Sequence, residues 1–341
     1  MCGIIGVARH SEAPATSAEV LRRMASAIRH RGPDDEGFYS GEGVALGMRR
    51  LSIIDLAGGH QPLANEDETL WLVCNGEIYN FRELRAGLQK RGHSFRTGSD
   101  VEVLLHLYEE SGEHFLESVS GMFALALWDV RRRRLVMARD RLGIKPLYYS
   151  LRDGRLAFAS EVKALLELPF IQADIDPEVL SEYLSLGYAV APRTLFRGIR
   201  KLPPATMLIW DRDGARTREY WSIPRQVRDD LDEDGWAELI RSELKRAVTE
   251  HMVSDVPIGA FLSGGIDSSA VVAFMAAAHG QPVNTYSIGY AGGGAAQYYD
   301  ELAYARQVAQ RFATHHTEIP VAPDVTALLP KLLWHVEEPI S

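Results

Sequence analysis

A cysteine stands at position 2, in the opening Met1-Cys-Gly-Ile-Ile-Gly6. Removal of one methionine would make Cys2 the N-terminal residue and would place a thiol and an α-amine on the same residue. Free thiols titrate near ~8.5 and α-amines near ~7.7 to 8.0, so the two groups suit a nucleophile and its base near neutral pH. The pattern predicts hydrolytic chemistry that needs no histidine. The alternative is a small buried side chain at the start of a strand.

A second candidate site is the loop Ser263-Gly-Gly-Ile-Asp-Ser-Ser269, which lies between a predicted strand and a predicted helix. Such a turn directs backbone N–H groups and the positive end of the helix toward one point, which favours anion binding. Glycine lets the backbone approach the anion closely, and Ser263, Ser268 and Ser269 offer hydroxyl donors. No lysine follows the glycines, so this is not the phosphate loop of kinases and GTPases. A turn made for packing alone is the alternative.

The composition indicates a globular protein that can bury a substantial core. The 341 residues are 46% hydrophobic and 24% charged, a length that suits about two domains. The longest apolar stretch, residues 270–278, is far shorter than the ~20 residues of a membrane span. Two cysteines, Cys2 and Cys74, and no disulfide framework predict a cytoplasmic protein. A net charge of -9 disfavours nonspecific binding to nucleic acid.

The first part of the chain has short apolar runs separated by turn residues, which is typical of antiparallel strands. Helical periodicity is found at residues 18–29, 81–91 and 101–111. Strands with segregated helices predict a layered α+β domain, and the basic cluster 131–134 is expected to be a solvated hairpin turn. The predicted strands are residues 2–8, 44–48, 70–74, 124–128, 135–138, 147–149 and 156–159.

The second part alternates helices and strands, which predicts a parallel sheet. The predicted elements are a helix at 236–250, a strand at 256–262, a helix at 268–279, a strand at 283–289 and a helix at 301–312. Residues 192–235, rich in Pro, Arg and Asp, contain a closing hairpin at 211–214 and a linker. The expected organisation is a first domain at 2–214, a linker at 215–235 and a second domain at 236–341.

Taken together, the motifs resemble those of the glutamine-hydrolysing asparagine synthetase family. The string Ser-Gly-Gly-x-Asp-Ser is similar to the loop of the ATP pyrophosphatases, and the first part resembles a class II glutamine amidotransferase domain. The matching segments, in chain order, are Cys2-Gly-Ile-Ile-Gly6, Arg29-His-Arg-Gly-Pro-Asp34, Arg50-Leu-Ser-Ile-Ile-Asp55, His60-Gln-Pro62, Asn75-Gly-Glu-Ile-Tyr-Asn80, Thr97-Gly-Ser-Asp100 and Arg139-Asp-Arg-Leu-Gly-Ile-Lys-Pro146. The resemblance implies an N-terminal-nucleophile αββα fold, followed by an α/β parallel sheet similar to adenine nucleotide α-hydrolases.

The resemblance also implies roles for residues of the first domain. Cys2 would be the nucleophile, and Asn75 with the N–H of Gly76 would stabilise the oxyanion. The glutamine carboxylate would meet Arg50, and its α-ammonium would meet Glu77 and Asp100. The backbone of Leu51, Ser52, Ile53 and Ile54 would line the pocket. In the family, the segment that matches residues 29–34 is a lid over bound glutamine. His30 is expected to have a structural role. Burial should keep the thiol of Cys74 unreactive.

For the second domain, the resemblance implies ATP binding with Mg²⁺ as its companion ion. The expected ATP contacts are Phe261, Leu262, Ser263, Gly264, Gly265, Ile266, Asp267, Ser268, Ser269 and Ile288. Asp267 is open to two interpretations, a carboxylate near Mg²⁺ or the N-cap of a helix, and no metal ligand is assigned. The expected small-molecule partners are glutamine, aspartate and ATP, with a homodimer as a further expectation. Neither a nucleic acid nor a membrane partner is expected.

The chain ends at Glu338-Pro-Ile-Ser341, inside a segment that resembles the family's Glu-Pro-x-x-Asp-Pro sequence. The second domain is therefore expected to be incomplete, without the aspartate-binding groups. One alternative is a related ATP-dependent ligase that amidates another acid in peptide or envelope-polymer synthesis. Another is an amidotransferase of sugar or purine synthesis, against which residues 263–269 argue. The last is a truncated glutaminase or regulatory partner.

Overall fold

The computed structural model describes residues 1–10, 13–227, 230–290 and 301–338. The chain divides into two structural units, the first formed by Met1–Pro224 with Leu333–Ser341 and the second by Arg225–Leu332. Each unit is described separately below. The final residues 339–341, which belong to the Glu-Pro segment of the sequence analysis, lie outside the described residues.

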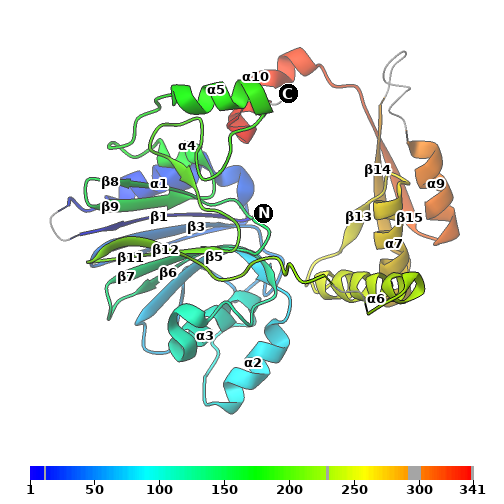
Figure 1. Ribbon diagram of the computed structural model, residues 1–341, viewed down its shortest axis with the longest axis horizontal. Helices are drawn as coiled ribbons and strands as arrows, with labels where there is room; N and C mark the ends of the chain where they lie inside the picture. Colours follow the sequence, from blue (N-terminus) through cyan, green and yellow to red (C-terminus); the bar gives the residue numbers. More distant parts are fainter. Residues whose placement is uncertain (11–12, 228–229, 291–300, 339–341) are drawn as a thin grey trace. The chain divides into compact units, whose positions relative to one another are not determined.

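Two antiparallel sheets of six strands each build the first unit (Figure 1). The first sheet has the order β10 (Arg200–Lys201), β8 (Tyr148–Arg152), β9 (Arg155–Ala159), β1 (Gly3–Arg9), β3 (Val44–Arg50) and β2 (Asp35–Gly41). The second has the order β12 (Gly214–Glu219), β11 (Thr206–Asp211), β7 (Arg134–Arg139), β6 (Gly121–Asp129), β5 (Leu70–Ile78) and β4 (Leu63–Ala64).

The two sheets pack face to face around an apolar core. Successive side chains of a strand point to opposite faces, so β1 can serve both sides of its sheet. Ile4 belongs to the core between the sheets, and Ile5 packs with helix residues on the outer face. Leu46 and Ala45 divide in the same way on β3. The first sheet therefore packs against the second sheet on one face and against helices on the other. This is the αβ half of the αββα layering that the resemblance implies.

Helices cover both outer faces of the sandwich, with α1 and α4 on one side and α2 and α3 on the other (Figure 1). Side-chain caps fix where two of the helices begin. The Ser17 side chain accepts from Val20 N at 3.3 Å at the start of α1, and Asp176 caps the helix that begins at Pro177. The helices are α1 (Ala18–Ala27), α2 (Phe81–Lys90), α3 (Val103–Ser111), α4 (Val162–Leu165) and α5 (Pro177–Leu186), with short 3₁₀ turns η1 (Arg29–Arg31), η2 (Asp100–Glu102) and η3 (Gly112–His114).

The second unit is built on a parallel sheet in the order β13 (Gly259–Phe261), β14 (Asn284–Tyr290) and β15 (His315–Val321). Its helices are α6 (Glu233–His251), α7 (Ile266–His279), α9 (Leu302–Arg311) and α10 (Val325–Val336), the last of which continues into the first unit. Leu262, Val272, Ala305 and Ala309 form its small buried core. None of the described helices is long and apolar enough to cross a membrane.

Most of the elements predicted from the sequence are present, with small changes of boundary. The parallel sheet and the hairpin at 211–214 are confirmed. Residues 131–134 lie at the β6–β7 turn, where each arginine pairs with a carboxylate, as expected of a solvated turn. Strand β12 occupies residues 214–219, of which the sequence analysis assigned 215–219 to the linker. Pairing with β11 keeps these residues in the sheet despite their polar character.

Candidate active site

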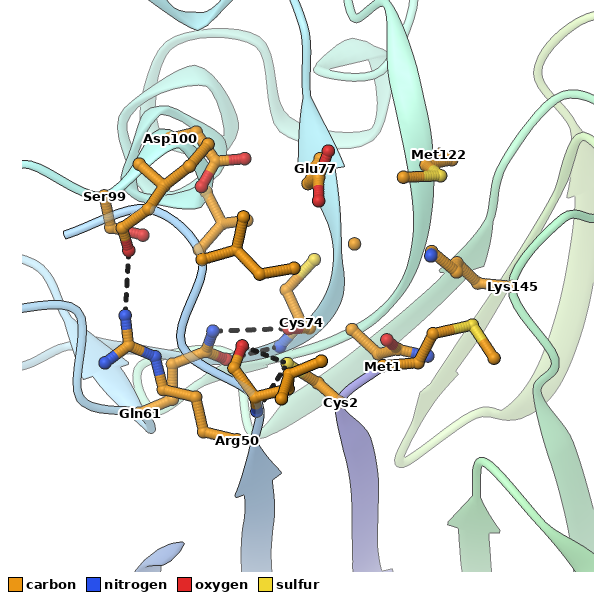
Figure 2. Close-up of a pocket in the computed structure, with 16 residues that line it drawn as sticks. Met1, Cys2, Arg50, Gln61, Cys74, Glu77, Ser99, Asp100, Met122 and Lys145 are labelled. Carbon is orange, nitrogen blue, oxygen red and sulfur yellow. Dashed lines mark hydrogen bonds between the residues drawn. The ribbon is translucent and has the colours of Figure 1, made fainter. Parts of the chain in front are cut away.

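A cavity of about 270 Å³ opens beside Cys2 in the first unit (Figure 2). Strand β1 places the cysteine there, because β1 lies between β9 and β3 and Cys2, the residue directly before it, packs against the edge of the core. The lining residues are Met1, Cys2, Arg50, Leu51, Ile53, Ile54, Gln61, Cys74, Asn75, Gly76, Glu77, Ser99, Asp100, Val101, Met122 and Lys145.

The sulfur of Cys2 is held by the backbone of Leu51. The Leu51 N–H donates to Sγ at 3.4 Å, and the thiol donates to the Leu51 carbonyl oxygen at 3.5 Å. Arg31 Nε donates to the Cys2 carbonyl oxygen at 2.8 Å and so fixes the backbone of the same residue. Burial raises the pKa of the Cys2 thiol, while the Leu51 N–H and the nearby positive charges of the N-terminus, Arg50 and Lys145 oppose that rise.

Beyond its short pairing with β4, strand β5 supplies a row of polar groups to the pocket along the edge that faces away from β6. Its other edge pairs with β6, and alternate backbone N–H groups of a strand point to the same side. Cys74 N donates to Gln61 Oε1 at 2.7 Å, and Ile78 N donates to Asp100 Oδ2 at 2.7 Å. Gly76 lies between these two residues, so its N–H points to the same edge and toward the pocket that Gly76 lines.

Asn75, next to Gly76 on β5, carries an unsatisfied buried donor. Its side chain is 1% exposed, and within the described residues its Nδ2 has no hydrogen-bond partner. A buried amide without a partner is costly, and such groups are found where a ligand completes the bonding. Asn75 Nδ2 and Gly76 N–H are therefore two adjacent donors suited to a developing negative charge on an oxygen.

Arg50 supports the loop that forms one wall of the pocket. Its Nη2 donates to the carbonyl oxygens of Ile54 and Asp55 at 2.9 and 2.8 Å, and Nη1 donates to that of Leu56 at 3.3 Å. A guanidinium has five N–H groups, so two stay available within the described structure. Gly59 lies close to this guanidinium, since a Cβ at position 59 would stand 2.2 Å from Arg50 Nη2.

Glu77 and Asp100 bring negative charge to the opposite side of the pocket, as Figure 2 shows. Asp100 is 4% exposed, and burial raises its pKa to about 6. The N–H of Ile78 lowers that pKa, and the charge of Glu77 raises it further. A cationic group that entered the pocket would relieve this repulsion. The guanidinium of Arg50 and these carboxylates therefore suit the two charged ends of an amino acid.

The structure brings together the residues expected to act on glutamine, apart from Ser52. Ser52 does not line the cavity; its N–H donates to Asp34 Oδ2 at 2.9 Å. His30 also lies outside the lining and contacts Glu161 Oε1 at 3.0 Å, in agreement with the structural role expected for it. Burial raises the pKa of the Cys74 thiol well above its ordinary value, which agrees with the expected inertness.

The sequence analysis missed several residues of the lining. Lys145 is 6% exposed and is held by Asp140, which accepts the N–H groups of Ile144 and Lys145 at 2.9 Å each. Gln61 clamps β5, because its Nε2 also donates to the Cys74 carbonyl oxygen at 3.2 Å. Lys145 lies in the family-matching segment 139–146 and Gln61 in the segment 60–62, so these motifs could have led to both residues. Met1, Ser99, Val101 and Met122 complete the missed set with Cys74.

In the second unit, residues 263–265 lie in the expected turn between strand β13 and helix α7, and residues 266–269 form the first turn of that helix. Ser263 Oγ lies 3.0 Å from Ser268 Oγ and accepts from Gly265 N at 3.3 Å, so the turn is closed by its own hydroxyls. Gly264 has a φ of +87°, and a Cβ there would stand 2.5 Å from backbone of Tyr304. Gly265 is the N-cap of α7, so the interpretation of Asp267 as N-cap is wrong; Asp267 is an exposed residue of the first helical turn.

A second cavity, of about 370 Å³, adjoins this loop at the carboxyl ends of the strands. It contains five of the residues expected to bind ATP: Phe261, Leu262, Ser263, Ser268 and Ile288. Gly264, Gly265, Ile266, Asp267 and Ser269 belong to the loop but do not line the cavity. The sequence analysis missed Tyr286, Ser287, Tyr290, Glu301 and Leu302, which line it as well. Ligands of parallel sheets bind at this end of the strands.

Comparison with known proteins matches both parts of the chain. A family described as glutamine amidotransferase domain matches residues 1–221, and a family described as asparagine synthase matches residues 239–341. The chain is 38% identical to asparagine synthetase [glutamine-hydrolyzing] 1 of Bacillus subtilis, over 100% of this chain and 54% of that protein. It is 35% identical to putative asparagine synthetase [glutamine-hydrolyzing] 2 of Methanocaldococcus jannaschii, over 100% of this chain and 69% of that protein.

Among solved structures, the chain is similar to a glutamine phosphoribosylpyrophosphate amidotransferase of B. subtilis, with a TM-score of 0.46 and 20% identity over 83% of this chain and 65% of that one. The chain spans about half the length of the first curated relatives it matches. The amidotransferase match covers the whole sandwich that holds the Cys2 pocket, and the asparagine synthase match covers the Ser263–Ser269 loop. The chain therefore belongs to the glutamine-hydrolysing asparagine synthetase family.

Proposed function

We propose that the first unit hydrolyses glutamine to glutamate and ammonia at Cys2. The observation that carries the proposal is the buried, unpartnered Asn75 Nδ2 in the cavity that Cys2 lines. An amide bond passes through a tetrahedral oxyanion when it is hydrolysed, and two donors in a site shielded from water stabilise that charge. We assign this activity to the domain at 2–214, extended by the remainder of strand β12.

Before the reaction, Met1 is removed, which exposes the backbone nitrogen of Cys2 as a free α-amine. That amine takes the thiol proton, and the sulfur attacks the side-chain carbonyl carbon of glutamine. Asn75 Nδ2 and Gly76 N–H hold the oxyanion, and the amine returns the proton to the departing nitrogen, which leaves as ammonia. Water then attacks the glutamyl thioester, with the amine again as base, and releases glutamate and the free thiol.

Recognition of glutamine is assigned to the charged ends of the pocket. The free N–H groups of Arg50 would bind the α-carboxylate in a charge-assisted bond. Glu77 and Asp100 would accept from the α-ammonium. Arg50 anchors the backbone at 51–54 by donating to the carbonyl oxygen of Ile54. This backbone would set the distance between the bound substrate and Cys2.

For the second unit, we propose that residues 236–341 are part of a domain that binds ATP, adenylates aspartate and transfers ammonia to it, yielding asparagine, AMP and pyrophosphate. The Ser263–Ser269 loop suits the pyrophosphate of ATP, because it begins a helix and presents hydroxyl donors. The residues also fit Mg²⁺, which binds ATP phosphates together with one or two carboxylates, and exposed Asp267 offers one. When bound, Mg²⁺ would neutralise phosphate charge.

Two measurements test the proposal for the first unit. Intact mass of protein purified from cells is expected to show loss of one methionine. The full chain is then assayed for glutamate and ammonia release from glutamine without ATP. Hydrolysis by the processed chain supports the proposal, and a chain that retains Met1 yet hydrolyses glutamine contradicts the role of the Cys2 amine.

A separate measurement tests the second unit. Binding of Mg²⁺ and ATP to the full chain is followed by calorimetry, with Gly264→Ala as the variant. Added bulk at Gly264 would meet the backbone of Tyr304, displace the loop and weaken nucleotide binding. Equal affinity for the two proteins would contradict the assignment of the loop.

A further inference from the structure

A cluster of histidines and glutamates lies apart from both cavities, on the side of the sandwich covered by α2 and α3. Glu66 follows β4, His93 follows α2, and His106 and Glu109 belong to α3. The two imidazole rings have centroids 4.9 Å apart. Glu66, His93 and His106 each offer one ligand atom, and those atoms lie within 4.8 Å of one another.

The distances within this cluster suit a common metal ion. His106 Nδ1 lies 3.0 Å from Glu109 Oε2 and 3.7 Å from Glu66 Oε2, and His93 Nδ1 lies 3.4 Å from Glu109 Oε2. Two ligand atoms at about 2.0 to 2.1 Å from one zinc ion in tetrahedral geometry stand about 3.3 to 3.4 Å apart. These three distances scatter around that value, and the ligand atoms of Glu66, His93 and His106 lie within 4.8 Å of one another, so side-chain adjustments would complete the coordination.

Each carboxylate of the cluster is oriented by a bond to its other oxygen. Ser94 N donates to Glu66 Oε1 at 2.9 Å, and Asn65 Nδ2 donates to Glu109 Oε1 at 2.8 Å. The second oxygen of each carboxylate is thereby turned toward the imidazoles. Orientation of ligands by neighbouring hydrogen bonds is typical of metal sites in proteins.

Of the two histidines, His93 is oriented in the same manner, by a contact to its other ring nitrogen. His93 Nε2 contacts Glu110 Oε1 at 3.1 Å, on the ring edge away from Glu109. His106 is 1% exposed, and within the described structure its Nε2 has no hydrogen-bond partner; Glu102 Oε1 is 3.9 Å away. Histidines that bind a metal through one nitrogen commonly direct the other toward a carboxylate. Both rings therefore present Nδ1 to the centre of the cluster.

The charges of the cluster are compatible with a cation at its centre. Arg91 pairs with Glu110 at 2.6 Å, and Arg85 lies 3.7 Å from Glu102. Glu66 and Glu109 face the two Nδ1 atoms instead. If each histidine keeps its proton on Nε2, two nitrogen lone pairs meet two carboxylate oxygens, which is unfavourable. One divalent ion would relieve the repulsion, as would a proton on each Nδ1.

We propose that Glu66, His93, His106 and Glu109 bind one divalent transition-metal ion of the zinc class. Two imidazole nitrogens with carboxylate oxygens form a donor set that zinc prefers, whereas Mg²⁺ and Ca²⁺ prefer oxygen alone. The ion would join three separate segments, residues 63–70, the turn after α2 and helix α3. Its role is therefore structural, and it is independent of the chemistry at Cys2.

The test uses the full chain in the Cys2→Ala background, so that the thiol of the first pocket cannot bind metal. Protein stripped by a chelator is titrated with Co²⁺, whose visible absorption is intense in tetrahedral sites, and then with Zn²⁺. We expect one equivalent of Co²⁺ to produce the absorption band and Zn²⁺ to abolish it. Zn²⁺ is also expected to raise the unfolding temperature, as any ligand of the native state does.

Variants locate the site. His93→Ala and Glu66→Gln, which change partly exposed side chains, are each expected to weaken Co²⁺ binding at least tenfold. His114→Ala is the matched control, because His114 also pairs with a glutamate, Glu117, at 2.7 Å but lies outside the cluster. It is expected to leave binding unchanged.

The absence of an equivalent of bound Co²⁺ would overturn the proposal and leave the cluster as a protonated histidine–glutamate network. The same conclusion would follow if His93→Ala bound the ion as tightly as the parent, or if His114→Ala lost as much affinity as His93→Ala. Because the background lacks Cys2, none of these results depends on glutamine hydrolysis.

Discussion

The backbone of Leu51 contacts the sulfur of Cys2 through both of its polar groups, with N–H at 3.4 Å and the carbonyl oxygen at 3.5 Å. The thiol can donate to the carbonyl, and the thiolate can accept from the N–H. One residue therefore orients the sulfur in both protonation states, and deprotonation needs no rearrangement of the loop. This contact leads to expectations for the chemistry at Cys2.

Substitution of Cys2 by alanine is expected to abolish glutamine hydrolysis, because the sulfur is the proposed nucleophile. Cys74→Ala is the matched control: Cys74 lines the same cavity, but its thiol has a pKa well above the ordinary value because it is fully buried. We expect Cys74→Ala to retain activity. Release of ammonia is measured for both variants. Loss of activity in Cys74→Ala alone would show that Cys74, and not Cys2, is the nucleophile.

Substitution of Lys145 by methionine is expected to shift the pH dependence of kcat/KM to higher pH. Burial raises the pKa of the Cys2 thiol, and the positive charge of Lys145 is one of the effects that oppose this rise. Without that charge the thiolate forms at higher pH. Lys90→Met, an exposed change on α2, is the control and should leave the profile in place. A shift to lower pH would contradict the electrostatic role.

Substitution of Asn75 by alanine is expected to lower kcat about 10²- to 10³-fold with little change in KM, as for other donors that stabilise an oxyanion. Stability should hardly fall, because the variant breaks no side-chain hydrogen bond within the described structure. Steady-state kinetics and urea unfolding separate the two effects. A variant that lost stability but kept kcat would show that Asn75 is structural.

Substitution of Asp100 by asparagine is expected to weaken glutamine binding and to stabilise the fold. Loss of a charge-assisted bond to the α-ammonium would raise KM about 10- to 150-fold. Burial raises the pKa of Asp100 from 3.8 to about 6, so the folded protein binds this proton more tightly than the unfolded chain. The charged form therefore costs stability above pH 6, by about 3 kcal/mol at pH 7, and asparagine removes that cost.

The pH dependence provides the check. As pH falls through 6 toward 4, wild-type Asp100 takes up its proton in the folded state first, and stability rises toward that of the variant. At pH 5 the advantage of Asp100→Asn should be about half its value at pH 7. Urea unfolding at the two pH values measures it. An advantage that grew as the pH fell would show that the carboxylate is stabilising.

The sequence predicted the apolar strands of the sandwich well, since strands such as β1 and β6 are buried on both faces. It missed β2 (Asp35–Gly41), whose only fully buried residue is Gly37. That strand forms because β3 offers it an edge, a long-range condition that no local pattern contains. Strand β15, with half-exposed polar residues, was missed for the same reason.

The residues of the candidate site divide in the same way. Cys2 was predicted from its position and chemistry, and Asn75 and Arg50 were predicted from the resemblance of their motifs to those of the family. Gln61 and Lys145 were not, because their roles depend on contacts that only the fold creates: Gln61 bonds across to the backbone of Cys74, and Lys145 is turned inward by Asp140.

The position of β1 has a practical consequence. Chain ends are normally loose, but here Cys2 directly precedes a strand that pairs with β3 and β9, and Met1 already lines the cavity. An affinity tag fused to the amino terminus would occupy the substrate's space and would block exposure of the Cys2 amine. Purification handles for this protein belong at the carboxyl terminus, or behind a protease site that leaves cysteine first.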